Sequence, residues 1–132
     1  MRIQVKDFMS TPVVTAVAEN SISEIRTLMK DNGIHAIPII SYPKDDPEAE
    51  MTIQGIITAT DIRDQLKGNT TVQDVMTTSN VYVIHINSSA NAAAKMMLKH
   101  DVHHLVVMDN GKIKGMISSL DFVKLVAEHT LE

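Results

Sequence analysis

The chain has 132 residues and a formal net charge of −4, with 44% hydrophobic and 21% charged residues, which suits one compact domain or two very small units that share a core. This length excludes a multidomain enzyme, and the acidic balance argues against a nucleic-acid partner held by phosphate neutralisation. The sequence contains no cysteine, which excludes thiol nucleophiles and cysteine-based metal sites, and no apolar run approaches the roughly 20 residues of a membrane span, so we expect a cytoplasmic protein without a membrane partner.

The first elements in the chain are a predicted strand and a predicted helix. Residues 13–17 form a short β-rich run. Ser21 and Glu24 then have the spacing of a capping box, and apolar residues follow them at helical spacing. Gly33 is typical of a helix end, so we expect the helix to stop there.

A hairpin and a short helix are predicted next. Residues 37–40 and 53–57 are apolar runs that we expect to pair as antiparallel strands. The segment 41–50 between them contains two prolines and five charged residues, which predicts an exposed loop. A short helix is predicted to follow from Asp61.

The second half shows the same order of elements. Residues 81–86 are predicted as a strand, and a helix is predicted after Ser89. Asn110 and Gly111 lie between two apolar runs, which is a strong signal for a two-residue hairpin turn. The remaining predicted elements are the hairpin strands 105–108 and 113–117 and a short helix from Asp121.

Three motifs recur in order, which indicates an internal duplication. The recurring pairs are Val5-Lys6-Asp7-Phe8-Met9-Ser10 with Val72-Gln73-Asp74-Val75-Met76-Thr77, residues 33–40 with 101–108, and residues 55–62 with 115–122. We divide the chain into repeats at residues 1–67 and 68–132. Each repeat follows the order β-α-β-β-α, so the predicted class is α/β, of the mixed α+β kind. Neither repeat is large enough to bury both faces of its sheet, and we expect the two to pack as one pseudo-symmetric unit.

The third motif, Gly-h-Ile-[Thr/Ser]-x-x-Asp, carries the chemistry that the sequence offers. It occurs as Gly55 to Asp61 and as Gly115 to Asp121, where a strand ends and a helix begins. The hydroxyl of Thr58 or Ser118 and the free N–H groups of the helix could meet a phosphate, and the carboxylate could accept hydrogen bonds from both ribose hydroxyls. A purely structural interpretation also fits, because a hydroxyl at the N-cap and a carboxylate three residues later form a capping box.

No common catalytic motif occurs in the chain. The P-loop, the G-x-G-x-x-G loop, the H-E-x-x-H helix and the G-x-S-x-G elbow are all missing from the sequence. A base, a nucleophile and an orienting group cannot be assembled from the residues present. We therefore expect no enzymatic activity and no catalytic cofactor.

Together, the three motifs make the chain resemble a tandem pair of cystathionine-β-synthase (CBS) domains, also called a Bateman module. The resemblance extends from Val5 to about Ala127. It implies two β-α-β-β-α units packed through their sheets, a homodimer, and up to two clefts for adenosine-bearing ligands between the repeats. It also implies a regulatory role, in which ligand occupancy is transmitted to a regulated protein partner.

The resemblance places each cleft across both repeats. The carboxylate would hold the ribose, strand-edge backbone would contact the adenine edge, and apolar side chains would enclose the ring. One cleft would comprise Thr58, Asp61, Val83, Ile84, His103, His104 and Leu105. The other would comprise Ser118, Asp121, Thr15, Ala16, His35, Ala36, Ile37 and Pro38. We favour the second cleft, because the first has Val106 where the second has Pro38 and bulkier residues where the second has Thr15 and Ala16.

Three further questions stay open at the level of sequence. The ligand is AMP, ADP, ATP or S-adenosylmethionine, and the small number of nearby cations favours a monophosphate or the cationic adenosyl compound. Five of the six histidines lie in the second half, where His103 or His104 could contact a nucleotide, serve at a surface or bind a transition metal. The competing hypothesis is an interaction module that dimerises without ligand, with Asp61 and Asp121 acting only at helix starts.

Overall fold

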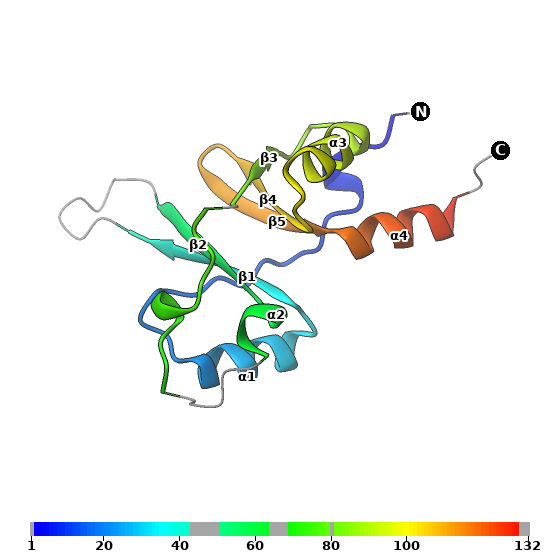
Figure 1. The fold of residues 1–132 in the computed structure, drawn as a ribbon. Coiled ribbons are helices and arrows are strands. Elements are labelled where there is room, and N and C mark those ends of the chain that lie inside the picture. The colour runs from blue at the N-terminus through cyan, green and yellow to red at the C-terminus, as the bar shows by residue number, and fades with distance from the viewer. Residues whose placement is uncertain (1, 43–50, 64–68, 80, 130–132) are drawn as a thin grey trace. The chain divides into compact units, whose positions relative to one another are not determined.

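A computed structural model describes residues 2–42, 51–63, 69–79 and 81–129, and the chain divides into two compact units. Unit 1 comprises Met1–Val13 and Tyr82–Glu132, and unit 2 comprises Val14–Val81. Each unit has a small sheet and two α-helices among its described residues (Figure 1). The predicted α+β class is confirmed.

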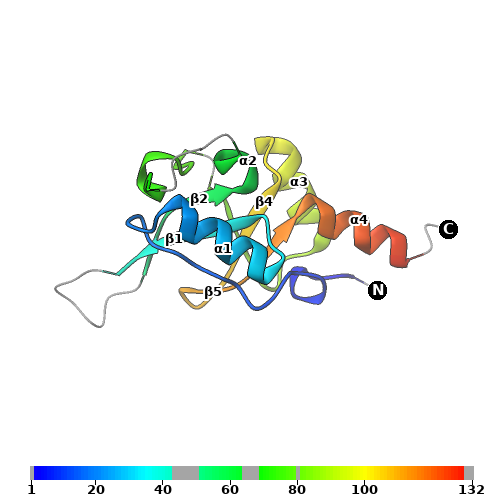
Figure 2. The same cartoon turned by 90° about the horizontal axis from the view of Figure 1, so that it is seen from below.

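Unit 2 is built on one antiparallel hairpin. Its elements are α1 (Ile22–Asn32), β1 (Ala36–Ser41), β2 (Thr52–Thr58), α2 (Ala59–Ile62) and a 3-10 turn (Val72–Asp74). The predicted hairpin is confirmed, since β1 pairs with β2. Helix α1 covers one face of the hairpin (Figures 1 and 2), where Ile22 and Ile25 pack in the same buried cluster as Ile37, Ile39 and Ile57.

Unit 1 has a third strand. Its elements are a 3-10 turn (Val5–Asp7), β3 (Val83–His85), α3 (Ala90–His100), β4 (His104–Asp109), β5 (Lys112–Ser118) and α4 (Ser119–Glu128). The strand order is β3-β4-β5, with β3 parallel to β4 and β4 antiparallel to β5. The core of this unit includes Val5 from the start of the chain together with Ile84, Leu105 and Ile117.

The predicted helix ends are present. Ser21 Oγ accepts a hydrogen bond from the Glu24 N–H, the Glu24 carboxylate accepts one from the Ser21 N–H, and Gly33 ends α1 in the left-handed conformation at φ 62°. Ser89 caps α3 through the Ala92 N–H. Local sequence signals thus define both long helices of the two repeats.

The two-residue hairpin turn predicted in the second repeat is present. Asn110 and Gly111 join β4 to β5 with positive φ values of 51° and 75°, the backbone that a two-residue hairpin turn requires. In the first repeat, β1 ends at Ser41, and most of the predicted loop 41–50 lies outside the described residues. Its exposure therefore stays a prediction.

The strand predicted at residues 13–17 is wrong in extent. Only Ala16 forms a bridge there, to Ile39, whereas the equivalent segment of unit 1 forms β3. Proline explains the difference. In unit 1 the Val106 N–H donates to the Tyr82 carbonyl, and the equivalent position in unit 2 is Pro38, which has no N–H to donate.

The opening segment of each sequence repeat pairs with the hairpin of the other repeat. Ser10 exchanges two backbone hydrogen bonds with Met116 of β5, at 2.8 and 3.1 Å. Thr77 exchanges two with Ile56 of β2, both at 2.9 Å. A compact unit therefore combines parts of both repeats. The predicted repeat boundaries at 1–67 and 68–132 describe the duplication in the sequence and stay a prediction.

The motif glycines lie directly beneath these crossing segments. A Cβ atom on Gly115 would come within 2.8 Å of the Ser10 carbonyl oxygen and of Met9 Sδ. A Cβ on Gly55 would come within 2.7 Å of the Thr77 carbonyl oxygen. Contacts this short with backbone cannot be relieved by turning a side chain, so glycine is required at both positions.

We expect Gly115→Ala to destabilise the protein by about 1 to 3 kcal/mol, because the new methyl group must push the Ser10 backbone away from β5. Chemical denaturation monitored by circular dichroism measures this loss. Lys114→Ala is the matched control on the same strand, since Lys114 is exposed, and it should change stability by less than about 0.5 kcal/mol. Equal stability of the two variants would contradict the crossing geometry.

Glu24 gives the fold a defined pH dependence. The side-chain amide of Asn20 donates to Glu24 at 2.7 Å, and this bond, with those to Ser21, lowers the pKa of Glu24. A lowered folded-state pKa stabilises the fold above the ordinary glutamate pKa, and this contribution is lost as the pH falls through the lowered value. Glu24→Gln should therefore melt below the wild type at neutral pH, with a difference that shrinks in acid. A melting difference independent of pH would refute this role.

Candidate functional site

The strand–helix turn of unit 1 (residues 118–121) is a complete capping box. The Asp121 N–H donates to Ser118 Oγ at 3.3 Å, and the Ser118 N–H donates to Asp121 Oδ2 at 2.9 Å. The structural interpretation of this motif is therefore present in the molecule. The capping box uses only part of the acceptor capacity of the Asp121 carboxylate, because two carboxylate oxygens offer about four acceptor positions.

The strand–helix turn of unit 2 (residues 58–61) repeats this geometry. The Asp61 N–H donates to Thr58 Oγ1 at 3.2 Å, and the Thr58 N–H donates to Asp61 Oδ2 at 2.9 Å. The N-cap dihedrals are nearly identical in the two turns, with φ −116° at both residues and ψ 163° at Thr58 and 164° at Ser118. The duplication in the sequence is thus a duplication of three-dimensional geometry.

The two aspartates differ in their surroundings. Asp121 is 8% exposed, and Ser10 Oγ donates to it at 3.3 Å from each carboxylate oxygen. Asp61 is only half-buried. Sequence reasoning missed Ser10 as a partner of Asp121, because 111 positions separate them. The one available signal was its place in the recurring Val-x-Asp-h-Met-[Ser/Thr] motif.

The histidines that precede β1 and β4 accept hydrogen bonds from the helix starts through their backbone carbonyl groups. The His103 carbonyl accepts a hydrogen bond from the Ser119 N–H at 3.0 Å, and the His35 carbonyl accepts one from the Ala59 N–H at 2.8 Å. His103 Nδ1 also lies 3.1 Å from Ser119 Oγ. His103 thus has a local role at the unit 1 turn, and nucleotide contact by His103 or His104 stays a prediction.

Several predicted cleft residues belong to the cores. Ala16 and Ile37 pack in the buried cluster of unit 2, and Ile84 and Leu105 pack in that of unit 1. Ile37 and Leu105 are 0% exposed, so their side chains belong to the core. Val83, in contrast, is 48% exposed on β3.

Within each unit, the structure brings part of the predicted set to the end of the hairpin where the helix begins. His104 is the register partner of Ser118 across β4 and β5, and Ala36 is the partner of Thr58 across β1 and β2. Val83 and Ile84 pair further along β4, with Val106 and Val107, and in unit 2 the Ala16 N–H donates to the Pro38 carbonyl. The predicted residues that belong to unit 2 are Thr15, Ala16, His35, Ala36, Ile37, Pro38, Thr58 and Asp61, and those that belong to unit 1 are Val83, Ile84, His103, His104, Leu105, Ser118 and Asp121. Each predicted cleft needs residues from both units and stays a prediction.

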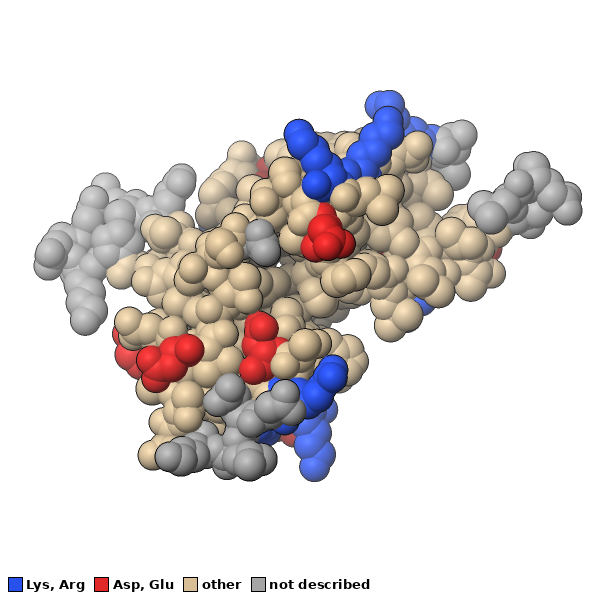
Figure 3. Space-filling model, in the orientation of Figure 1, with Lys and Arg blue, Asp and Glu red and all other residues tan. Residues whose placement is uncertain are grey.

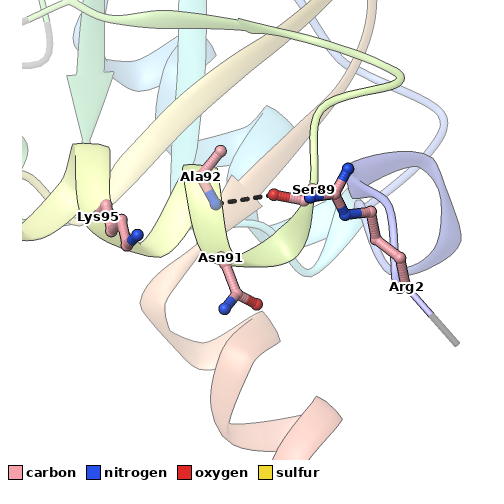
Figure 4. A pocket seen from close by; sticks show the side chains of 5 residues that line it. All are labelled: Arg2, Ser89, Asn91, Ala92 and Lys95. Carbon is pink, nitrogen blue, oxygen red and sulfur yellow. Dashed lines mark hydrogen bonds between the residues drawn. The ribbon is translucent and has the colours of Figure 1, made fainter.

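A cavity of about 550 Å³ lies elsewhere in unit 1, at the start of α3 (Figure 4). Its lining residues are Arg2, Ser89, Asn91, Ala92 and Lys95. Figure 3 shows basic side chains gathered over α3, which carries the exposed Lys95 and Lys99. None of the predicted binding residues lines this cavity. In the part of the chain that the structure describes, no three His, Cys, Asp or Glu residues lie close enough together to hold a metal ion, and no helix is long and apolar enough to cross a membrane.

Comparison with known proteins identifies the family. A family model for the CBS domain matches residues 5–68 and 72–128. The chain belongs to the CBS domain family. The predicted tandem pair is thereby confirmed, because the two matches follow one another along the chain and correspond to the two repeats.

Similar proteins include parts of larger enzymes and an isolated CBS pair. The chain is 33% identical over 128 residues to a homoserine O-acetyltransferase of Methanosalsum zhilinae, covering 96% of this chain and 25% of that protein. It is 28% identical over 108 residues to inosine-5′-monophosphate dehydrogenase of Staphylococcus aureus, covering 82% of this chain and 21% of that protein. The chain thus spans about a quarter or less of these relatives.

The fold matches a solved CBS domain pair along its whole length. The crystal structure of the CBS domain pair of protein MJ0100, in complex with 5′-methylthioadenosine and S-adenosyl-L-methionine, aligns with a TM-score of 0.80 and 28% identity. The alignment covers 97% of this chain and 98% of that one. The fold of this chain is therefore that of a CBS domain pair.

Proposed function

We propose that this CBS pair is a regulatory module that binds an adenosine-containing ligand through its two strand–helix turns. The observation that carries the proposal is the duplicated turn, which presents a carboxylate at the same place in each unit. The similarity to the MJ0100 pair, which binds two adenosine derivatives, supports it.

The chemistry of the turns suits a ribose. In each capping box, one carboxylate oxygen accepts the backbone N–H of the residue that caps the helix, and the carboxylate keeps further acceptor positions. Two adjacent ribose hydroxyls can donate to such a carboxylate together. The neighbouring strand ends would supply backbone groups for the adenine edge, which explains how a site without an aromatic residue could select a purine.

The ligand candidates are AMP, ADP, ATP and S-adenosylmethionine. Neither turn carries a basic residue in its first helical turn, so little positive charge is available to neutralise a triphosphate. A monophosphate or a cationic adenosyl compound requires less neutralisation and is the favoured class. The regulatory interpretation follows from the family, with ligand occupancy transmitted to a protein partner, and a cytoplasmic location is part of the same proposal.

Isothermal titration calorimetry with AMP, ADP, ATP and S-adenosylmethionine tests the proposal directly. We expect saturable binding of at least one of these compounds. We further expect Asp121→Ala to weaken binding more than Asp61→Ala, since the unit 1 turn belongs to the cleft that the sequence favours. Losing a charge-assisted bond to a ribose hydroxyl should weaken binding by roughly tenfold or more.

Thermal unfolding of both aspartate variants is the control, because each change also removes a capping box. Loss of binding by a variant that remains folded at the assay temperature supports a direct contact. No binding of any of the four compounds at millimolar concentration by folded wild type would refute the proposal. Equal or reversed losses of affinity in the two variants would contradict only the preference for the Asp121 turn and would leave the proposed binding in place.

The second candidate function is an interaction module that dimerises without ligand. One observation favours it, since α4 leaves three apolar side chains exposed at a spacing of three residues: Leu120 at 54%, Val123 at 60% and Val126 at 50%. Such a stripe is typical of a helix that packs against another helix. We propose that it serves a homodimer, which is also compatible with ligand binding.

Native mass spectrometry at micromolar concentration measures dimerisation and retained nucleotide in one experiment. We expect the wild type to be dimeric and Val123→Lys to shift it to monomer, because the charge would be desolvated at the apolar stripe. Lys124→Ala, on the neighbouring exposed position, should leave the dimer intact. A monomeric wild type, or a Val123→Lys dimer, would contradict the proposed interface.

A further inference from the structure

We infer that the Ser10 hydroxyl acts as a latch on the Asp121 carboxylate. By latch we mean that this hydroxyl occupies the carboxylate, competes there with the hydroxyls of a ribose, and so sets the ligand affinity of the unit 1 turn. The inference rests on the proposed function, in which Asp121 accepts hydrogen bonds from a ribose. It goes further by naming a residue from the start of the chain as the regulator of that acceptor.

The geometry of the bond is that of a competitor. Ser10 Oγ lies 3.3 Å from Asp121 Oδ1 and 3.3 Å from Oδ2, so the hydroxyl is shared between the two carboxylate oxygens. Two adjacent ribose hydroxyls would approach the same pair of oxygens. The Ser118 N–H donates to Oδ2 from the helix start, and this bond does not depend on which hydroxyl the carboxylate accepts.

The Ser10 backbone is anchored, so the latch can open by side-chain rotation alone. Two hydrogen bonds to Met116 hold the backbone of Ser10 against β5. Phe8 and Phe122 fix the same segment to α4, with ring centroids 5.0 Å apart in an edge-to-face contact. Ser10 itself is exposed, so its released hydroxyl can bond water, and the cost of release is small.

The other unit lacks the latch although its backbone is the same. Thr77 occupies the position of Ser10 and pairs with Ile56 through equivalent backbone hydrogen bonds. Among the described residues, no hydrogen bond joins Thr77 to Asp61, whose carboxylate accepts from the Thr58 N–H and is only half-buried. The duplicated motif thus gives one covered and one more accessible carboxylate.

The test is calorimetric titration of the Ser10→Ala protein with AMP and S-adenosylmethionine. We expect affinity at the Asp121 turn to rise by roughly three- to tenfold, because ligand no longer displaces a hydrogen bond. Thr77→Val removes the equivalent hydroxyl of unit 2 and should leave the affinity unchanged.

Two controls separate a latch from a merely structural effect. In an Asp121→Ala background, Ser10→Ala should have no effect on affinity, because the acceptor is gone. For 2′,3′-dideoxy-AMP, which lacks both competing hydroxyls, Ser10→Ala should give no gain. Circular dichroism and thermal unfolding of each variant establish that it is folded.

The outcomes distinguish the latch from the function on which it rests. If wild type binds AMP or S-adenosylmethionine and Ser10→Ala binds equally or more weakly, the latch is refuted and the binding function stands. If neither wild type nor Ser10→Ala binds AMP, ADP, ATP or S-adenosylmethionine, both proposals fail. An affinity gain from Ser10→Ala that persists in the Asp121→Ala background, or that also appears with 2′,3′-dideoxy-AMP, would refute competition between Ser10 and the ribose hydroxyls.

Discussion

The structure depends on two places where one backbone segment crosses another with no room for a side chain. At each, a residue pair of the Met-[Ser/Thr] type lies across a hairpin strand, directly over the glycine that opens the Gly-h-Ile-[Thr/Ser]-x-x-Asp motif. The carbonyl oxygens of Ser10 and Thr77 would lie 2.8 and 2.7 Å from a Cβ atom on Gly115 and Gly55. The first motif of one repeat and the third motif of the other are therefore two sides of one contact.

This contact explains why neither repeat forms a unit from its own sequence alone. Val5 lies in the buried cluster that also contains Leu105 and Ile117, and Val72 lies in the cluster that contains Ile37 and Ile57. Each sheet is small, and the segment from the other repeat supplies core that the local sequence lacks. The exchange also gives the start of the chain access to the Asp121 turn, which a repeat folded by itself would not allow.

The features that sequence predicts well are those fixed by neighbours in the chain. The capping box at Ser21, the stop at Gly33 and the turn at Asn110 and Gly111 each need only three or four residues and appear as expected. The strand at 13–17 fails because a strand exists only through its partner, and Pro38 withholds a donor that Val106 supplies in unit 1. The exchange of segments is invisible to the repeat pattern, since the same apolar residues would suit either sheet.

In the candidate site, too, the sequence predicts contacts between near neighbours in the chain and misses contacts between distant residues. The motif predicts the Thr58–Asp61 and Ser118–Asp121 capping contacts, because donor and acceptor are three residues apart. It gives both aspartates the same role. Their hydrogen bonding differs because the fold brings Ser10 to Asp121 across 111 positions, whereas among the described residues Thr77 makes no such bond to Asp61.

Under the proposed function, a duplicated motif therefore need not give two turns of equal ligand affinity. The helix start is set by its own strand and turn, so duplication preserves it, as the matching N-cap dihedrals show. The residue that crosses above the turn comes from the other repeat, and it can diverge without disturbing the cap. Ser10 and Thr77 keep the same backbone pairing, which the glycines enforce, but only the serine side chain reaches the carboxylate. Under the proposed function, selection could thus tune one turn through a residue whose role in the fold is already fulfilled by its backbone.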